Sequence, residues 1–306
     1  LITYYRVSYR KETVSKNITN PFPELTEKER HVIVKKFYRS SCNHFAEIVK
    51  LVSISHRGLE KNIDIRGIDI LEKYYNEKRH VILALGHCGN WETAIILPKF
   101  MKQEMFAVYR PLENGFIDKL MRDIRSRFNT HMISDKKVAR HMLTPRDESL
   151  VYYMLADQCP LKVIEKYRIP FLNQSTAMYN GVEKLAQATN AAVVYLSILP
   201  GKRAGRYIMD FSLITDTPKE TAETEITRTY AARLEENIRQ APCSWLWRHK
   251  RWRRCPGLSK IALTPFIRPS ICFAYLNWRA RLPGISVSGI HEMANRVYGY
   301  RCVPNV

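Results

Sequence analysis

The residues best suited to chemistry are a histidine and a glutamate, His87 and Glu92, which stand five positions apart directly after an apolar run. That run, Val81–Leu85, predicts a buried strand. Asn90 is suited to the N-cap of a following helix, which would place Glu92 in the first turn, where the helix dipole favours an ionised carboxylate. Across so tight a turn the carboxylate can accept an imidazole N–H and fix the tautomer. The other ring nitrogen of His87 is then available to take a proton from a hydroxyl.

Such a pair is the base-and-orienter half of a Ser-His-Asp triad, with a hydroxyl of the substrate in place of the serine. The alternative is a surface histidine and a helix-capping glutamate with no joint role. Cys88 is a second alternative, as a nucleophile, although neighbouring side chains diverge.

Two further strands are predicted to end in polar residues. Arg110 follows the apolar residues 105–109, and Asp157 and Gln158 follow residues 150–156. In open α/β sheets, ligands bind beyond the carboxyl ends of the strands. If these strands are parallel neighbours, Arg110, Asp157 and His87 meet at one edge.

The elements that would position these residues alternate between strand and helix. Thr26 and Glu29 form a capping-box pattern before a helix over residues 26–55. Strands are predicted at 81–85, 105–109, 150–156, 192–199 and 207–213, and helices at 69–77, 91–101, 116–128, 136–144, 181–189 and 218–240. This alternation predicts an α/β fold with a central, mostly parallel sheet flanked by helices and preceded by a helical segment.

Composition narrows the class of protein. The chain has 306 residues, 45% of them hydrophobic, which excludes a disordered chain. Its net charge of +20 favours an anionic partner, such as nucleic acid, an anionic membrane, a phosphorylated lipid or an acidic carrier protein. The seven cysteines have no CxxC spacing, and there is no GxGxxG, Walker A or HExxH motif, so no metal site or nucleotide fold is predicted. No apolar run reaches 18 residues.

A basic aromatic cluster occupies residues 245–254. We expect a membrane or headgroup contact from its rings and cations, namely Trp245, Trp247, Arg248, Arg251 and Trp252. The same residue types would suit single-stranded nucleic acid. A third interpretation is a helix that packs its tryptophans inward and leaves a solvated basic face.

Taken in order, these motifs resemble those of a known family. Residues 86–92, Gly-His-Cys-Gly-Asn-Trp-Glu, resemble the His-x4-Asp/Glu (HX4E) motif of the lysophospholipid acyltransferase superfamily, and more narrowly of the late acyltransferases of lipid A biosynthesis, the lauroyl/myristoyl type. Residues 108–114, Val-Tyr-Arg-Pro-Leu-Glu-Asn, resemble the Tyr-Arg-Pro-x-x-Asn element of that family, and 155–158 its Ala-Asp-Gln element. Residues 245–252 resemble its closing Trp-x-x-His-Arg-Arg-Trp/Phe. The resemblance covers residues 4–254.

The resemblance implies a glycerolipid acyltransferase-like fold and an O-acyltransferase with His87 and Glu92 as the catalytic pair. Arg110 would bind a phosphate or steady the oxyanion, and Asp157 would be structural or hold the acceptor. The substrate-binding residues expected with them are Asn90, Trp91, Asn114 and Gln158. The donor would be the thioester of acyl-carrier protein, the acceptor a hydroxyl of an anionic lipid A precursor, and no cofactor, metal or nucleic acid would be needed. A related enzyme with another envelope lipid or a lysophospholipid as acceptor remains open, as does a non-enzymatic binder, which would not need the His-Glu pair.

The resemblance also divides the chain. Residues 1–255 would form the acyltransferase domain, and residues 256–306 an irregular tail of doubtful function. The family usually begins with an apolar anchor helix, which is not present here, so we expect a peripheral protein at the cytoplasmic face of the inner membrane of a Gram-negative envelope. Cys159 and Pro160 stand where the family often has Asp/Asn-x-Gly, which puts the detail of that loop in doubt.

Overall fold

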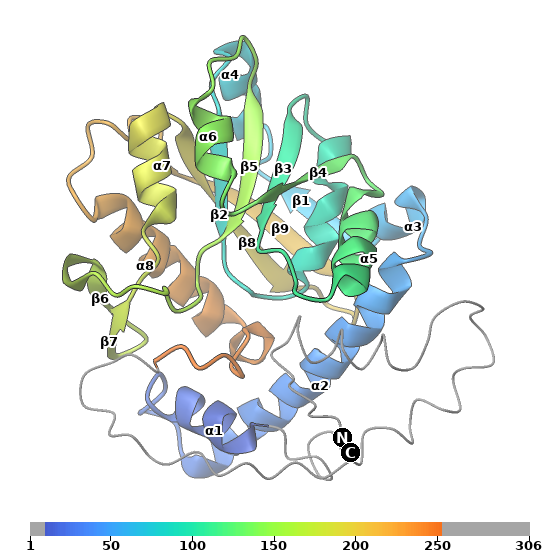
Figure 1. Ribbon diagram of the computed structural model, residues 1–306. Coiled ribbons are helices and arrows are strands. Elements are labelled where there is room, and N and C mark those ends of the chain that lie inside the picture. The colour runs from blue at the N-terminus through green and yellow to red at the C-terminus, as the bar shows by residue number, and fades with distance from the viewer. Residues whose placement is uncertain (1–9, 253–306) are drawn as a thin grey trace.

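The structure, a computed structural model, describes residues 10–252 (Figure 1). A central sheet is covered by helices on both faces, which confirms the predicted α/β class. The tail predicted for 256–306 lies outside the described residues. None of the helices within 10–252 is both long and apolar enough to cross a bilayer.

The sheet has seven strands in the order β1-β9-β8-β2-β5-β3-β4. Every neighbouring pair is parallel except β8 and β9, which form an antiparallel hairpin. The strands are β1 (Ile63–Arg66), β2 (Val81–Leu85), β3 (Glu104–Tyr109), β4 (Thr130–Ser134), β5 (Leu150–Leu155), β8 (Ala192–Pro200) and β9 (Tyr207–Thr215). A separate antiparallel hairpin joins β6 (Arg168–Phe171) to β7 (Gln174–Ala177).

The helices lie around this sheet in chain order. They are α1 (Lys11–Thr19), α2 (Glu27–Leu51), α3 (His56–Glu60), α4 (Ile70–Asn76), α5 (Gly115–Ser126), α6 (Val138–Leu143), α7 (Gly181–Thr189) and α8 (Glu225–Gln240), with 3₁₀ turns η2 (Trp91–Lys99), η3 (Glu165–Tyr167) and η4 (Pro242–Ser244). Helix α2 begins where predicted, because Thr26 and Glu29 form the capping box. The helix predicted at 91–101 is a 3₁₀ helix that contains Pro98. The helix predicted from 218 begins only at Glu225, after a turn at 218–224.

Alternate residues of the central strands enter two different cores. One core lies under α6, α7 and α8 and takes Ile82, Ala84, Tyr152, Met154, Val193 and Tyr195. The other lies under α4, η2 and α5 and takes Val81, Leu83, Leu85, Val151, Tyr153 and Val194. Because both faces of β2 and β5 are covered, these strands are apolar throughout, and polar groups can be placed only where the strands end.

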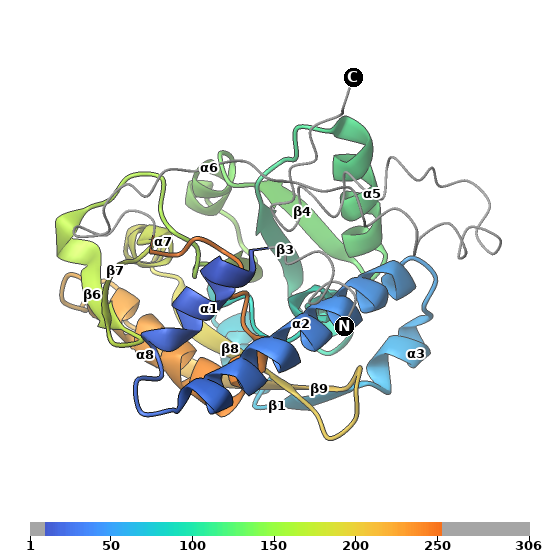
Figure 2. The ribbon, with the colours of Figure 1, turned by 90° about the horizontal axis from the view of Figure 1, so that it is seen from below.

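The carboxyl ends of β8, β2, β5, β3 and β4 share one edge of the sheet. The strands that end in His87, Asp157 and Arg110 are therefore parallel neighbours, as the predicted convergence requires. Helices α1 and α2 and the closing segment (residues 241–252) lie across this edge, which Figure 2 shows from below. The closing segment is tied to the end of β2 by a hydrogen bond from the Gly89 amide to the Ser244 carbonyl, 3.2 Å.

Candidate active site

His87 and Asp157 form a close pair where β2 and β5 end. His87 Nδ1 lies 2.5 Å from Asp157 Oδ1, and the His87 amide donates to Asp157 Oδ2 at 2.9 Å. The carboxylate is buried, whereas 12% of the imidazole side chain is exposed. These two contacts to one carboxylate fix both the ring and the backbone of His87. Because Asp157 accepts from Nδ1, the proton of the neutral ring is on Nδ1, and Nε2 is free to accept a proton.

The closing segment completes this pair from the opposite end of the chain. Trp245 Nε1 donates to Asp157 Oδ2 at 2.7 Å, and the indole is buried. The Gln158 amide lies 3.3 Å from His87 Nε2, on the exposed side of the ring. Each oxygen of Asp157 therefore has a partner, and Gln158 lies at the ring nitrogen of His87 that does not face Asp157.

The electrostatics keep Asp157 ionised. Burial alone would raise the pKa of this carboxyl group. The charge and hydrogen bonds of His87, with the hydrogen bond from Trp245, outweigh burial and hold the pKa well below its usual value. A carboxylate that stays negative can orient the imidazole and stabilise the imidazolium that forms when the ring takes a proton.

Glu92 does not orient His87, so that part of the sequence prediction is wrong. Its carboxylate is buried and takes a two-pronged contact from Arg125 of α5, at 2.8 Å from Nε and 2.7 Å from Nη2. Burial would raise the pKa of Glu92, but the Arg125 charge dominates and lowers it. Asn90 does cap η2 as predicted, but η2 carries Glu92 away from the imidazole and towards α5.

The two neighbours of Glu92 that were expected to bind substrate are both inside the fold. Asn90 is fully buried and donates to Glu47 at 2.8 Å. The Trp91 ring meets the His87 ring edge-on, with centroids 4.7 Å apart, and its Nε1 donates to Glu92 at 3.2 Å. Trp91 is therefore a wall of the site, and Asn90 holds the loop in place.

Arg110 and Asn114 lie on the next part of the same edge. Arg110 follows β3 and donates from Nε to Asp135 at 2.9 Å, with 67% of its side chain exposed. Asn114 caps α5 by accepting from the Ile117 amide at 3.0 Å. Because β5 lies between β2 and β3, the backbones at His87 and Arg110 are about 10 Å apart, and Arg110 leans towards β4. Arg110 is therefore at the same edge as His87 but is not in contact with the His87–Asp157 pair.

The basic aromatic cluster is buried, so the predicted headgroup contact by its side chains is wrong. Buried members are Trp245, Trp247, Arg248, Arg251 and Trp252. Each indole N–H has an internal acceptor, for example Thr176 for Trp252 at 2.8 Å, and Arg251 donates to the Ala177 carbonyl at 2.8 Å. The segment is a run of turns and not a helix, so the third interpretation was right about the direction of the rings and wrong about the element.

Cys88 is buried beside His87, and burial raises the pKa of its thiol well above the usual value. A thiol that remains protonated is a poor nucleophile, which argues against the cysteine alternative. Among residues 10–252 no group of His, Cys, Asp and Glu side chains could hold a metal ion.

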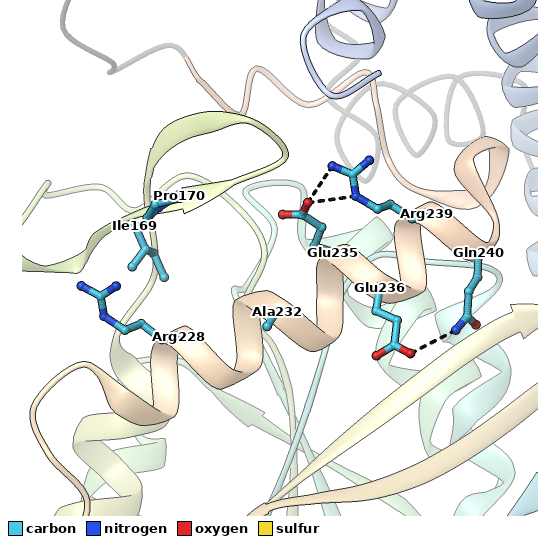
Figure 3. A pocket seen from close by; sticks show the side chains of 8 residues that line it. All are labelled: Ile169, Pro170, Arg228, Ala232, Glu235, Glu236, Arg239 and Gln240. Carbon is cyan, nitrogen blue, oxygen red and sulfur yellow. Dashed lines mark hydrogen bonds and ion pairs between the residues drawn. The ribbon is translucent and has the colours of Figure 1, made fainter. Parts of the chain in front are cut away.

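A hollow on the outer side of α8 does not belong to this site. Figure 3 shows it lined by Ile169, Pro170 and residues of α8 that include Arg228, Glu235 and Arg239. Arg239 is paired with Glu235 at 2.7 Å, so its charge is compensated within the helix.

The comparisons with known proteins agree with the motifs. The family model of bacterial lipid A biosynthesis acyltransferases matches residues 2–254. The chain belongs to this family. It is 20% identical over 246 residues to a lipid A biosynthesis acyltransferase of Haemophilus influenzae, which covers 79% of this chain and 76% of that protein. It is 25% identical to the lipid A biosynthesis lauroyltransferase of Escherichia coli (81% and 80% covered) and 20% identical to the myristoyltransferase of the same organism (76% and 71% covered). The chain is accordingly an O-acyltransferase of lipid A biosynthesis.

Two contacts of the site were not found from the sequence. The Arg125–Glu92 pair joins residues 33 positions apart, and the Trp245–Asp157 hydrogen bond joins residues 88 positions apart. Neither spacing carries a local signal. The His87–Asp157 pair has a signal, since both residues are expected at one edge, but the tight turn before a helix start and the His-x4-Asp/Glu resemblance favour Glu92.

Proposed function

We propose that this protein transfers a fatty acyl chain from the thioester of acyl-carrier protein to a hydroxyl of a lipid A precursor, with His87 as general base. The observation that carries this proposal is the His87–Asp157 pair at the exposed edge of the sheet, in a chain of the lipid A acyltransferase family. Asp157, and not Glu92, is the carboxylate that orients the imidazole.

The proposed reaction is a direct transfer. His87 Nε2 takes the proton of the acceptor hydroxyl while the hydroxyl oxygen attacks the thioester carbonyl carbon, which gives a tetrahedral intermediate. The intermediate collapses with cleavage of the C–S bond, and the imidazolium returns the proton to the leaving thiolate. Products are the acylated lipid and the free thiol of the carrier. Asp157 stays ionised throughout and stabilises the imidazolium.

The remaining side chains of the edge fit the acceptor. Gln158 lies beside Nε2, where its amide can give way to the incoming hydroxyl or hydrogen-bond to it. Arg110 offers an exposed guanidinium suited to a phosphate of the precursor. Glu92 and Arg125 would hold Trp91 and the start of η2, and so the wall on which the His87 ring rests. We place this reaction at the cytoplasmic face of the inner membrane, where both substrates would meet.

The test is transfer of a labelled acyl group from acyl-carrier protein to a lipid A precursor in detergent, by the wild type and by His87→Ala. We expect measurable transfer by the wild type and a loss of about 10³-fold in kcat for the variant, because alanine has no group that can take the proton of the hydroxyl. Circular dichroism controls for folding. Substantial residual turnover in a folded variant would remove His87 as base.

The acceptor is tested in the same assay with a lysophospholipid in place of the precursor. If the acyl group were transferred to the lysophospholipid and not to the precursor, and still only with His87 present, the proposed reaction would stand and the proposed acceptor would be wrong.

A further inference from the structure

The turn between β8 and β9 carries an isolated group of cations. Its sequence, residues 201–206, is Gly-Lys-Arg-Ala-Gly-Arg, and Lys202, Arg203 and Arg206 are all exposed. The turn is closed by hydrogen bonds from the Gly201 amide to the Arg206 carbonyl, 2.7 Å, and from the Arg206 amide to the Arg203 carbonyl, 3.1 Å. Gly205 has a φ of +77°, which favours glycine. We call this turn the basic tip.

The cations of the basic tip differ from many others along both edges of the sheet, which have acidic partners, such as Arg110 with Asp135 at the carboxyl edge. At the amino edge, five cations have an acidic partner, in the pairs Lys73–Asp216, Lys78–Asp147, Arg79–Glu77, Lys102–Glu72 and Arg146–Glu148. Within residues 10–252, none of the three cations of the basic tip has an ion pair. The basic tip therefore adds uncompensated positive charge at the carboxyl edge, where the active site lies.

The β8–β9 hairpin packs against the 86–92 loop, which contains His87. Gly89, two residues after His87, has a φ of +58° and lies so close to Ile198 and Tyr207 that a Cβ there would meet the Ile198 Cγ2 at 2.9 Å. Glu47 joins the two parts, because it accepts from Tyr207 at 2.7 Å and from Asn90 at 2.8 Å. Arg203 lies at most about 18 Å along the chain from Ile198. The charges of the tip therefore lie within that distance of a residue that packs against Gly89, at the same edge of the sheet as His87.

We propose that the basic tip is a docking contact for the acidic surface of the acyl-carrier protein, which it holds while the thioester arm enters the site. The proposal rests on the proposed function for the nature of the donor. A protein partner suits the tip better than a bilayer does, because the tip has Ala204 as its one apolar side chain besides the glycines and therefore has nothing to insert among acyl chains. Paired opposite charges steer such encounters and weaken with salt.

The experiment compares two triple charge reversals in the full chain. One is K202E/R203E/R206E in the basic tip, and the other is K102E/R146E/K219E at the amino edge, which changes the net charge by the same amount. We expect the tip variant to raise the KM for acyl-carrier protein by about tenfold or more at low salt, with kcat within about threefold, and the amino-edge variant to change KM by less than about twofold. With an acyl-pantetheine donor, which lacks the protein, both variants should match the wild type.

Binding of fluorescently labelled acyl-carrier protein, measured by anisotropy without an acceptor, separates this proposal from the proposed function. Tip-dependent binding without turnover would retain the docking contact and refute the reaction. Turnover with the same KM in both variants would retain the reaction and refute the docking contact. If the tip variant lost as much activity with acyl-pantetheine as with acyl-carrier protein, the docking contact would also be refuted, because the tip would then affect the active site itself. Loss of binding to phosphatidylglycerol vesicles, with KM for the carrier unchanged, would reassign the tip to a lipid surface.

Discussion

A buried carboxylate lies at each end of the 86–92 loop, and the two carboxylates have different partners. At the first end, Asp157 faces the imidazole of His87 and the indole of Trp245. At the second end, Glu92 faces the guanidinium of Arg125. Both carboxyl groups are held in their charged form, since their pKa values lie below the usual range.

The difference between the partners decides what each end can do. A histidine can gain and lose a proton at neutral pH, and Nε2 of His87 reaches the exposed side of the ring, so the first end can carry out acid–base chemistry. An arginine keeps its charge, so the second end is a fixed structural clamp between η2 and α5. Burial and negative charge alone therefore do not make a carboxylate catalytic.

The largest effect expected from this comparison is that of Asp157→Asn. The new amide oxygen can still accept from Trp245 and the His87 amide, which turns the NH₂ group towards His87 Nδ1. The ring must then carry its proton on Nε2, where it cannot accept one from a hydroxyl. We expect kcat to fall by about 10²–10⁴-fold with little change in KM. Steady-state kinetics check this, and a fall of less than tenfold would mean that Asp157 does not set the tautomer.

Glu92→Gln should affect stability more than chemistry. The change removes the carboxylate charge of the Arg125–Glu92 pair, which costs about 3–5 kcal/mol for a fully buried pair. Because one fifth of the Arg125 side chain is exposed, we expect about 2 kcal/mol in urea unfolding, with kcat within about tenfold. Arg125→Gln is the matched control, and the double variant should lose less than the sum of the two. A 10³-fold loss of kcat at unchanged stability would show that Glu92 acts on His87 after all.

The sequence was sufficient for the fold and for the edge at which the site lies. Apolar runs predict β2 and β5, and the parallel alternation brings their carboxyl ends together. It was not sufficient for the partner of His87, because spacing along the chain favours Glu92, whereas pairing of β2 with β5 sets Asp157 beside the ring. The short strands β1 and β4 were missed, since each has polar residues within it and little apolar pattern.

The basic aromatic cluster was misjudged for a related reason. Its composition is the same whether the rings face a membrane or the core, and only the tertiary acceptors distinguish the two. Trp245 finds Asp157, Trp252 finds Thr176, and Arg251 finds the Ala177 carbonyl. These partners lie between 74 and 88 residues away, so no local pattern contains them.

Trp245→Phe should have a smaller effect on the first end. The substitution keeps an aromatic ring and removes the N–H that Asp157 Oδ2 accepts, so the pKa of Asp157 should rise and its hold on the imidazole should weaken. We expect about a tenfold fall in kcat, the size of one charge-assisted hydrogen bond, measured by steady-state kinetics. Trp247→Phe is the control, because Trp247 donates to the Pro242 carbonyl and not to the pair. An equal fall in kcat in both variants would show that Trp245 contributes through packing and not through its hydrogen bond to Asp157.

The smallest effect concerns a second histidine on the other side of Trp91. His44 contacts the Trp91 ring at a centroid distance of 4.3 Å, and its Nδ1 donates to the Gly89 carbonyl at 3.2 Å. Burial lowers the pKa of His44 to about 3, an effect that the charge of Glu92 opposes and that of Arg248 assists. The unfolded chain keeps the ordinary pKa of 6.5 and so binds a proton between pH 6.5 and 3 that the folded chain does not bind.

The free energy of unfolding should therefore decrease as the pH falls through that window, by up to about 1.4 kcal/mol per pH unit. His44→Gln can keep the hydrogen bond to Gly89 and cannot titrate, so urea unfolding at pH 4 to 7 should show a shallower decline for this variant, while activity at pH 7 stays within about threefold. His87 differs from His44 in having Asp157 beside it and in being partly exposed. If the free energy of unfolding fell equally with pH in the wild type and in His44→Gln, His44 would take up its proton in the folded protein. The second end of the loop would then be open to water.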